Sequence, residues 1–220
     1  MRSNRNAIAL GVLVAAALAA TATLAEESTT AATPAPMHLL LVRHASAWKN
    51  VPPAQRPHAM SAAELDSLTP QGRARAESIG RSLAGKGVVA VYASPAQRAQ
   101  QTAAAIATAL GLGAPITNQA FRPLDTGTDT TAARGTTRMK NWKSGRDPRP
   151  PSGESLADGQ TRASDALAEL AKQHAGQTVV VVTHGEIASS LITRAAGQEL
   201  LANYFKNFPE EGSIHPLEIR

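Results

Sequence analysis

The chain of 220 residues contains no cysteine and few aromatic residues. Without cysteine it has no disulfide, no thiol nucleophile and no lipid-modified cysteine. Aromatic side chains make up only 3% of the composition, so we expect a core built from Ala, Val, Leu and Ile. Hydrophobic residues make up 43%, which in a chain of this length predicts one domain with a sizeable core.

A long apolar run is also missing. The run from Ala7 to Ala20 is shorter than the ~20 apolar residues that span a bilayer. It follows Arg2 and Arg5 and precedes Thr23-Leu24-Ala25, which is typical of a secretory signal peptide. The protein would therefore be periplasmic or secreted, with no stable membrane anchor after cleavage. The predicted organisation is a signal peptide over 1–25, a flexible linker over 26–36 and one domain over 37–220.

The excess of positive charge is small. The formal charge of +5 comes from 22 basic and 17 acidic residues, and it falls to +3 once Arg2 and Arg5 leave with the signal. Nucleic-acid binding calls for clustered Lys and Arg with stacking aromatics, so we expect no nucleic-acid partner. The remaining balance favours a small anionic substrate.

Two aliphatic strands are predicted to end at histidines. Leu39–Val42 precedes Arg43-His44, and Val179–Val182 precedes Thr183-His184-Gly185. Apolar runs of this length predict buried strands. An unpaired imidazole is unfavourable in a core, and in open α/β sheets ligands bind outside the carboxyl ends of the strands. We therefore expect both histidines to face a binding crevice.

A further arginine, Arg98, follows another predicted strand, which lies between these two in the sequence. The sequence predicts a strand over Val88–Ala93 and then a helix whose first turn contains Arg98. The helix dipole disfavours an arginine at that end. A bound dianion would compensate for this, and the alternative is an arginine that extends into solvent.

The remaining segments continue the alternation of helix and strand. Thr69 and Pro70 are typical of a helix start. We also predict a strand over Ile116–Leu124, a helix starting within Ser152–Ser155 and an edge strand over Ile214–Ile219. This order predicts an α/β fold with three layers, α/β/α, in which helices cover both faces of a mostly parallel sheet.

The segment from Asp125 to Pro151 is predicted to be partly helical, with a loop that would cover the crevice. Lys140, Trp142 and Lys143 are candidates for substrate contact. The alternative, which a charge run in such a loop favours, is that they form solvated surface.

Four residues are expected to meet at the carboxyl edge of the sheet. Two guanidinium groups there would bind a tetrahedral oxyanion, and two histidines would attack it and stabilise the transferred charge. This is a layout for phosphoryl transfer through a covalent phosphohistidine. A metal site of His44, His184 and Asp125 is the competing interpretation, but the arginines would repel the cation. The four residues are Arg43, His44, Arg98 and His184.

The motifs together resemble the histidine phosphatase superfamily, also called the phosphoglycerate-mutase-like family. The resemblance extends from His38 to about Ile219. The matching motifs, in order, are Arg43-His44-Ala45, Leu68-Thr69-Pro70-Gln71-Gly72, Ser94-Pro95 with Arg98 and Gln101-Thr102-Ala103, Gly153-Glu154-Ser155 and Thr183-His184-Gly185.

The resemblance implies a role for each residue. His44 would be the nucleophile, Arg43 and Arg98 would clamp the phosphate, and His184 would stabilise the transferring group. Asn50 lies where the family commonly has a phosphate-contacting asparagine. Apart from the resemblance, Gly185 has no side chain to block close approach of a substrate. We expect no cofactor and no metal, and a small phosphorylated substrate.

Two positions depart from the family pattern. Ala45 replaces a glycine, and its methyl group beside the nucleophile would narrow the pocket or shift the histidine. The family often has a proton-donating glutamate four residues before a glycine, where this chain has Pro123. Asp125 is the nearest substitute and Asp129 the next, although a turn-forming aspartate is the ordinary explanation for either.

The leading hypothesis is an exported phosphatase that hydrolyses phosphomonoesters through His44. A phosphoprotein (phosphohistidine) phosphatase is one alternative. A catalytically silent anion-binding module of the same fold is another. Mutase activity is less favoured, because the middle segment is short and export would remove the enzyme from cytoplasmic glycolysis.

Overall fold

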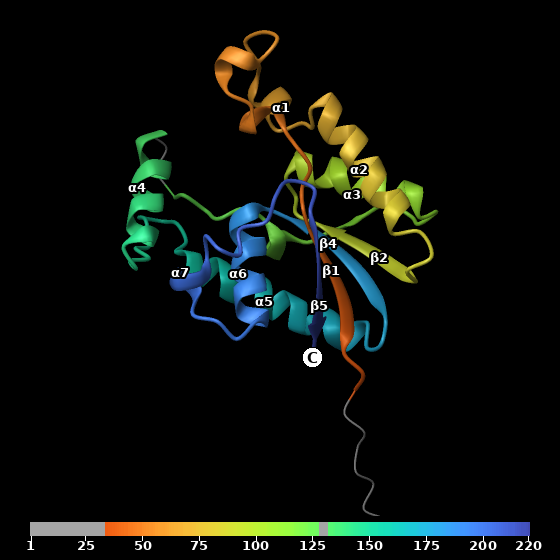
Figure 1. The fold of residues 1–220 in the computed structure, drawn as a ribbon. Helices are drawn as coiled ribbons and strands as arrows, with labels where there is room; N and C mark the ends of the chain where they lie inside the picture. Colours follow the sequence, from red (N-terminus) through yellow and green to blue (C-terminus); the bar gives the residue numbers. More distant parts are fainter. Residues whose placement is uncertain (1–33, 128–131) are drawn as a thin grey trace, which may run out of the picture. The chain divides into compact units, whose positions relative to one another are not determined.

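A computed structural model describes residues 34–127 and 132–220 of the chain. The predicted signal peptide and most of the predicted linker lie outside these residues, so both remain predictions. Among the described residues no helix is long and apolar enough to cross a membrane. Residues Pro34–Arg220 form one structural unit, which is described below (Figure 1).

Five strands form one sheet in the order β3-β2-β4-β1-β5. The first four run parallel, and β5 pairs antiparallel with β1 at one edge. The mostly parallel sheet confirms the predicted fold class. The strands are β1 (Met37–Arg43), β2 (Val88–Ala93), β3 (Ile116–Thr117), β4 (Thr178–Thr183) and β5 (Ile214–Ile219).

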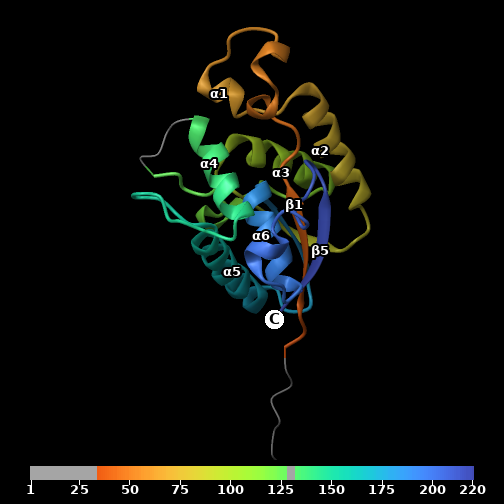
Figure 2. The same ribbon diagram turned by 60° about the vertical axis from the view of Figure 1, so that its left-hand side comes forward.

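Helices cover both faces of the sheet because the central strands β1 and β4 carry buried apolar side chains on both sides. The helices α2 (Pro70–Ser82) and α3 (Gln97–Ala109) pack on one face, where they bury Val42, Val180 and Val182. The helices α5 (Leu156–Gln173) and α6 (Gly185–Ala195) pack on the other face. Figures 1 and 2 show these two pairs on opposite sides of the strands.

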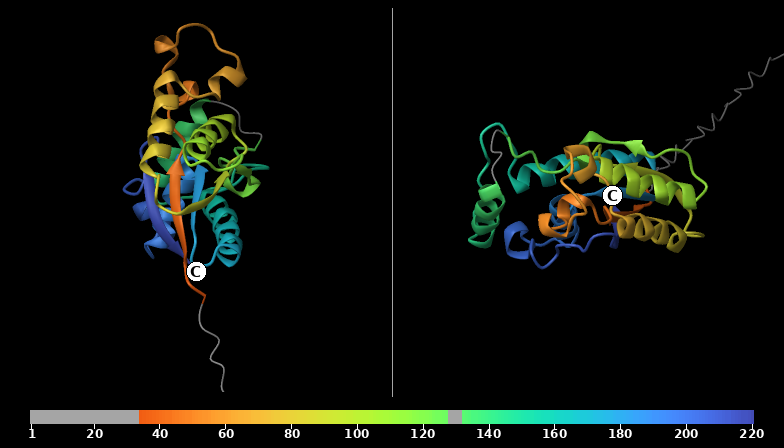
Figure 3. Two further views of the ribbon diagram at one scale, coloured as in Figure 1. Left: turned by 90° about the vertical axis from the view of Figure 1, so that its right-hand side faces the viewer. Right: turned by 90° about the horizontal axis from the view of Figure 1, so that it is seen from above.

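The short elements lie mainly in the connections. Beyond the carboxyl end of β1, the chain forms the orange segment in Figure 3, which contains two 3-10 turns and a short helix. These short elements are η1 (Trp48–Asn50), η2 (Pro53–Gln55), α1 (Ala62–Leu65), η3 (Gln119–Phe121) and α7 (Leu200–Asn203). The longer helix α4 (Ala132–Lys143) also lies in a connection.

The predicted strand over Ile116–Leu124 was too long. Only Ile116 and Thr117 pair with β2. The side chain of Asn118 then accepts a hydrogen bond from the Ala120 amide at 2.8 Å and starts η3. A short polar side chain that bonds the neighbouring backbone offers the chain an alternative to the strand ladder.

The middle segment is partly helical, as predicted, since it contains α4. Trp142, however, neither faces solvent nor lines the crevice. It is 3% exposed and packs edge-on against Tyr204, with ring centroids 4.9 Å apart. Lys140 and Lys143 are exposed. The indole belongs to the core because it is the largest apolar group that α4 offers in a chain with few aromatics.

The start of α2 fixes the loop that follows β1. The hydroxyl of Thr69 accepts a hydrogen bond from the Gly72 amide at 2.9 Å, which confirms the predicted helix cap. The Ser46 carbonyl accepts one from the Thr69 amide at 2.9 Å. A Cβ atom on Gly72 would lie 2.0 Å from that carbonyl oxygen. Gly72 is therefore required for the close approach of this loop to α2.

We expect Gly72→Ala to lower the free energy of unfolding by about 1–3 kcal/mol, because the added methyl group forces the backbone apart. Helix propensity alone would have the opposite effect, a gain of about 1 kcal/mol. Urea unfolding measures the difference. Gly113→Ala is the control, since its Cβ would have no atom within 4 Å. Equal stability of Gly72→Ala and the wild-type protein would contradict the expectation.

Candidate active site

The register of β1 and β4 places the two histidines side by side. Arg43 pairs with Thr183, so His44 and His184 leave neighbouring parallel strands at the same level. The His44 amide donates a hydrogen bond to the Thr183 carbonyl at 2.9 Å, which extends the ladder by one residue. The centroids of the two imidazole rings are 5.2 Å apart.

His44 is held with its Nε2 atom toward the pocket. The ring is buried at 4% exposure, and its Nδ1 atom lies 2.8 Å from the Ala45 carbonyl. A carbonyl only accepts, so Nδ1 carries the proton and Nε2 keeps its lone pair. That lone pair accepts a hydrogen bond from Nε of Arg98 at 3.1 Å.

Arg98 joins the two histidines. Besides His44, its guanidinium donates through Nη2 to Nδ1 of His184 at 2.9 Å. Because Nδ1 accepts, Nε2 of His184 carries the proton and donates to the Ser94 hydroxyl at 2.7 Å. The remaining nitrogen of the guanidinium, Nη1, pairs with the Asp66 carboxylate. Arg98 is 5% exposed, so it does not extend into solvent.

Both imidazoles are kept neutral by their surroundings. Burial lowers the pKa of His44 to about 4, and the charges of Arg98 and Arg43 add to this against the opposing hydrogen bond with Ala45. Burial, followed by the charges of Arg98 and its neighbours, also lowers the pKa of His184 well below its ordinary value. At neutral pH the positive charge at the strand ends is therefore carried by guanidinium groups, not by the histidines.

Arg43 has an unused donor. Its Nη1 atom donates to the Pro209 carbonyl at 2.8 Å, and its Nη2 atom lies 3.3 Å from the Glu211 carboxylate. Its Nε atom is buried and has no hydrogen-bond partner in the part of the chain that is described. A buried charged donor without a partner is costly, and an anion oxygen would satisfy it.

One pocket of about 270 Å3 brings most of the predicted site residues together. Arg43, His44, Arg98 and His184 all line it, together with Asn50 and Gly185. Asn50 donates to the Glu211 carboxylate at the rim. Residues that sequence reasoning missed also line this pocket: Lys49, Pro123, Leu124, Thr126, Arg138, Glu186 and Phe208.

The missed residues differ in how visible they are in the sequence. Lys49 precedes Asn50, and Glu186 follows Gly185, so proximity to the motifs could have suggested both. Arg138 lies on α4 and Phe208 follows α7, and no motif marks either residue. Partial desolvation and the Arg98 charge lower the pKa of Lys49, while Asp66 and Glu186 act in the opposite direction.

Asp125 is not brought together with the other site residues. It is exposed, and its carboxylate accepts a hydrogen bond from the Gly127 amide at 2.8 Å. This is the turn geometry that an aspartate commonly adopts. Asp129 lies outside the described residues. Within the described residues no three His, Asp or Glu side chains gather as a metal site would require.

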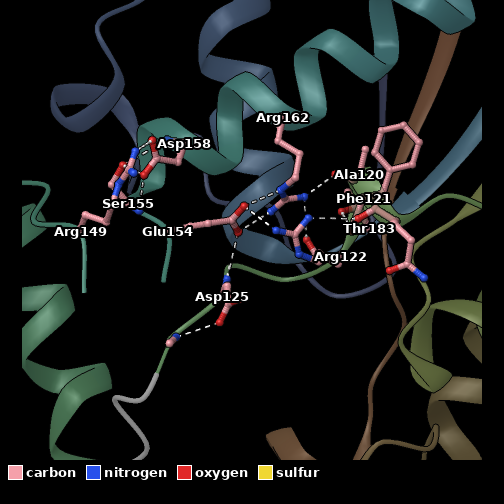
Figure 4. A network of polar contacts seen from close by, with 12 residues as sticks. Ala120, Phe121, Arg122, Asp125, Arg149, Glu154, Ser155, Asp158, Arg162 and Thr183 are labelled. Atoms are coloured by element: carbon pink, nitrogen blue, oxygen red, sulfur yellow. Dashed lines mark hydrogen bonds and ion pairs between the residues drawn. The ribbon is translucent and has the colours of Figure 1, made fainter. Parts of the chain in front are cut away.

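The loop that carries Asp125 is fixed by a network around Glu154 (Figure 4). Glu154 accepts hydrogen bonds from Arg122 at 2.7 Å, from Arg162 at 2.7 and 2.8 Å, and from the Asp125 amide at 3.1 Å. Arg162 also donates to the Ala120 carbonyl. Charge-assisted bonds of this kind give Glu154 of the Gly153-Glu154-Ser155 motif a structural role, which is to hold one wall of the pocket.

Ala45 does not narrow the pocket. Its methyl group is fully buried and packs with Ala47, Leu68 and Ala76, away from the pocket lining. Its amide donates to the Thr102 hydroxyl at 3.1 Å, while its carbonyl accepts from His44. The expectation of a narrowed pocket was therefore wrong, because the side chain turns toward α2.

The fold and the pocket define a class of protein, an α/β protein with two arginines and two histidines in one pocket at the carboxyl edge of its sheet. Residues 39–219 match the sequence model of the histidine phosphatase superfamily (branch 1). The chain belongs to the histidine phosphatase superfamily, as its motifs predicted.

The chain is also similar to individual known proteins. A 2,3-bisphosphoglycerate-dependent phosphoglycerate mutase of Methylobacterium radiotolerans is 35% identical over 138 residues, 57% of this chain and 65% of that protein. The match thus spans less than two thirds of that relative. Two solved structures share the fold: YhfR of Bacillus stearothermophilus (TM-score 0.66, 23% identity, 84% of this chain and 92% of that chain) and a mycobacterial glucosyl-3-phosphoglycerate phosphatase complexed with VO3 (0.65, 22%, 81% and 90%).

We expect Ala45→Gly to lower the free energy of unfolding by about 1–2 kcal/mol, because a buried methyl group is lost and the unfolded chain gains freedom. The affinity for inorganic phosphate should stay unchanged, since the methyl group faces away from the pocket. Urea unfolding and calorimetric titration with phosphate measure the two quantities. Tighter phosphate binding by Ala45→Gly would contradict this placement.

The lowered pKa of His44 predicts a loss of stability in acid. As pH falls from 6.5 to 4, the unfolded chain takes up a proton at His44 and the folded chain does not. Stability is fully present above pH 6.5 and falls by on the order of 3 kcal/mol across this window. Urea unfolding from pH 7 to 4 should show a smaller fall for His44→Gln. Equal falls in both proteins would show that His44 titrates normally.

Proposed function

We propose that the protein is a phosphoric monoester hydrolase that acts through a covalent phosphohistidine on His44. The observation that carries this is the neutral His44 ring, whose Nε2 lone pair meets the Arg98 guanidinium in a pocket beside an unpaired donor of Arg43. A neutral imidazole is the nucleophilic form, and two guanidiniums suit a tetrahedral dianion.

Binding of the substrate would replace contacts within the pocket. Phosphoryl oxygens accept the hydrogen bonds that Arg98 now donates to the two imidazoles, and another oxygen accepts from the free Nε of Arg43. This exchange frees the Nε2 lone pair of His44 for attack. Asn50 and the α6 N-terminus at Gly185 border the same pocket and add donors for the anion.

In the first step, Nε2 of His44 bonds to phosphorus and the bond to the ester oxygen breaks. The positive charge that develops on the His44 ring is stabilised at Nδ1–H by the Ala45 carbonyl. The bound dianion favours protonation of His184, which then donates to the transferring group. In the second step, water attacks phosphorus, the N–P bond breaks, and inorganic phosphate leaves.

Family membership supports a phosphoryl-transfer enzyme, and the choice of hydrolysis is part of the proposal. The family includes both the mutase and the phosphatase described above. The predicted signal peptide favours hydrolysis outside the cytoplasm, of a substrate encountered there. A phosphohistidine on another protein is an alternative substrate, and a silent anion-binding module is the alternative from a different class.

We expect the purified protein to release p-nitrophenol from p-nitrophenyl phosphate and to be phosphorylated on His44 during turnover. His44→Ala should lose at least about 10^3-fold in kcat/KM, because the nucleophile is removed. Phosphate release and mass analysis of protein quenched in alkali measure the two effects. His58→Ala is the matched control, since His58 is an exposed histidine paired with Glu64 outside the pocket.

Other results would decide between the alternatives. Equal background rates for His44→Ala and the wild-type protein, with phosphate binding retained in both, would support the silent module. Turnover of a phosphohistidine peptide but not of p-nitrophenyl phosphate would support the phosphoprotein phosphatase. Unaltered activity in EDTA would separate the histidine mechanism from a metal-dependent one.

A further inference from the structure

The pocket is rich in cations and has one carboxylate. Arg43, Lys49, Arg98 and Arg138 line it, and among the lining residues of the described chain Glu186 is the only acid. Hydrolysis of an alkyl phosphate needs an acid that delivers a proton to the departing oxygen. A candidate acid must lie in the pocket and be free to reach that oxygen.

The other carboxylates near the site are already engaged. Asp66 accepts from Arg98 and from the Gln97 amide. Glu211 accepts from Arg43 and Asn50. Neither Asp66 nor Glu211 lines the pocket. Both carboxylate oxygens of Glu154 accept hydrogen bonds from arginines. The carboxylate of Asp125 accepts a hydrogen bond from the Gly127 amide within a turn.

Glu186 is placed differently. It lies in the first turn of α6, two residues after His184, and is half-buried. Among the residues whose side chains the structure describes (34–127 and 137–220), none makes a hydrogen bond or ion pair with its carboxylate. Its charge acts on Lys49, on one side of the pocket. It also adds to the effect of burial in raising the pKa of Tyr204, whose buried hydroxyl has no partner in the described structure.

We propose that Glu186 is the proton donor of the reaction, an inference that rests on the proposed function. In the first step its carboxyl group gives a proton to the ester oxygen as the P–O bond breaks, so the alcohol leaves neutral. In the second step the Glu186 carboxylate takes a proton from the water that attacks phosphohistidine. The N–P bond breaks, phosphate is released, and Glu186 is again protonated.

A glutamate in the first turn of a helix also interacts favourably with the helix dipole. In that role Glu186 would stabilise the fold and would take no part in proton transfer. The two roles differ in one measurable respect, which is the dependence of the rate on the leaving group. A p-nitrophenolate leaves readily without a proton, whereas an alkoxide does not.

The test compares kcat/KM for p-nitrophenyl phosphate and for glycerol 2-phosphate in the wild-type protein and in Glu186→Gln. We expect Glu186→Gln to lower the value for glycerol 2-phosphate by about 10^2–10^4-fold and the value for p-nitrophenyl phosphate far less. kcat/KM depends only on the steps up to loss of the alcohol, so the rate of phosphohistidine hydrolysis does not affect the comparison. Phosphohistidine should also accumulate in Glu186→Gln with the aryl ester, because the attacking water has lost its base.

An equal loss on both esters, with the wild-type protein active on both, would overturn the assignment and leave the proposed function standing. The leaving-group split in Asp125→Asn instead would move the role to Asp125. A wild-type protein that hydrolyses neither ester would overturn the proposed function itself.

Two further variants guard against trivial explanations. Glu77→Gln removes an exposed carboxylate on α2 that pairs with Arg81 outside the pocket, and it should leave both rates unchanged. Glu186→Asp keeps an acid at the same place and should show a smaller split, even where Glu186→Gln folds poorly. A thermal melt of each variant reports the structural contribution separately.

Discussion

The Arg98 guanidinium, buried between two neutral imidazoles, is the interaction on which the site depends. Its three nitrogen atoms donate hydrogen bonds to His44, His184 and the Asp66 carboxylate, so one side chain sets the position of both rings. A buried charge of this kind is tolerated only with full hydrogen bonding. Burial keeps the rings neutral and the charge of Arg98 adds to this effect, so the positive charge of the pocket is carried by guanidinium groups.

The fold produces that arrangement through register and close packing. Parallel pairing of β1 with β4 sets His44 beside His184, and α3 begins at the same edge of the sheet with Arg98 in its first turn. The Ala45 methyl group packs toward α2, where Gly72 lets the loop after β1 approach the helix. The histidine loop is therefore fixed by apolar contacts behind it, and the pocket in front stays open.

The opposite wall of the pocket has a different origin. It depends on charge. Glu154 accepts hydrogen bonds from Arg122, Arg162 and the Asp125 amide, and these bonds hold the loop that includes Leu124. Arg138 and Phe208 complete the lining from segments that lie far apart in the sequence. Motif residues thus surround the two histidines, while residues outside the motifs form the rest of the pocket lining.

The sequence by itself determined the layers, the parallel sheet and the four residues at its edge, because aliphatic runs and helix caps such as Thr69 are local signals. It also placed Asn50 and Gly185 at the pocket. Tertiary structure alone decided the directions of side chains. It turned Asp125 outward into a turn and Glu186 into the pocket, buried Trp142, and ended β3 after two residues. These outcomes depend on which neighbours compete for each group, and those neighbours come from distant segments that no local pattern specifies.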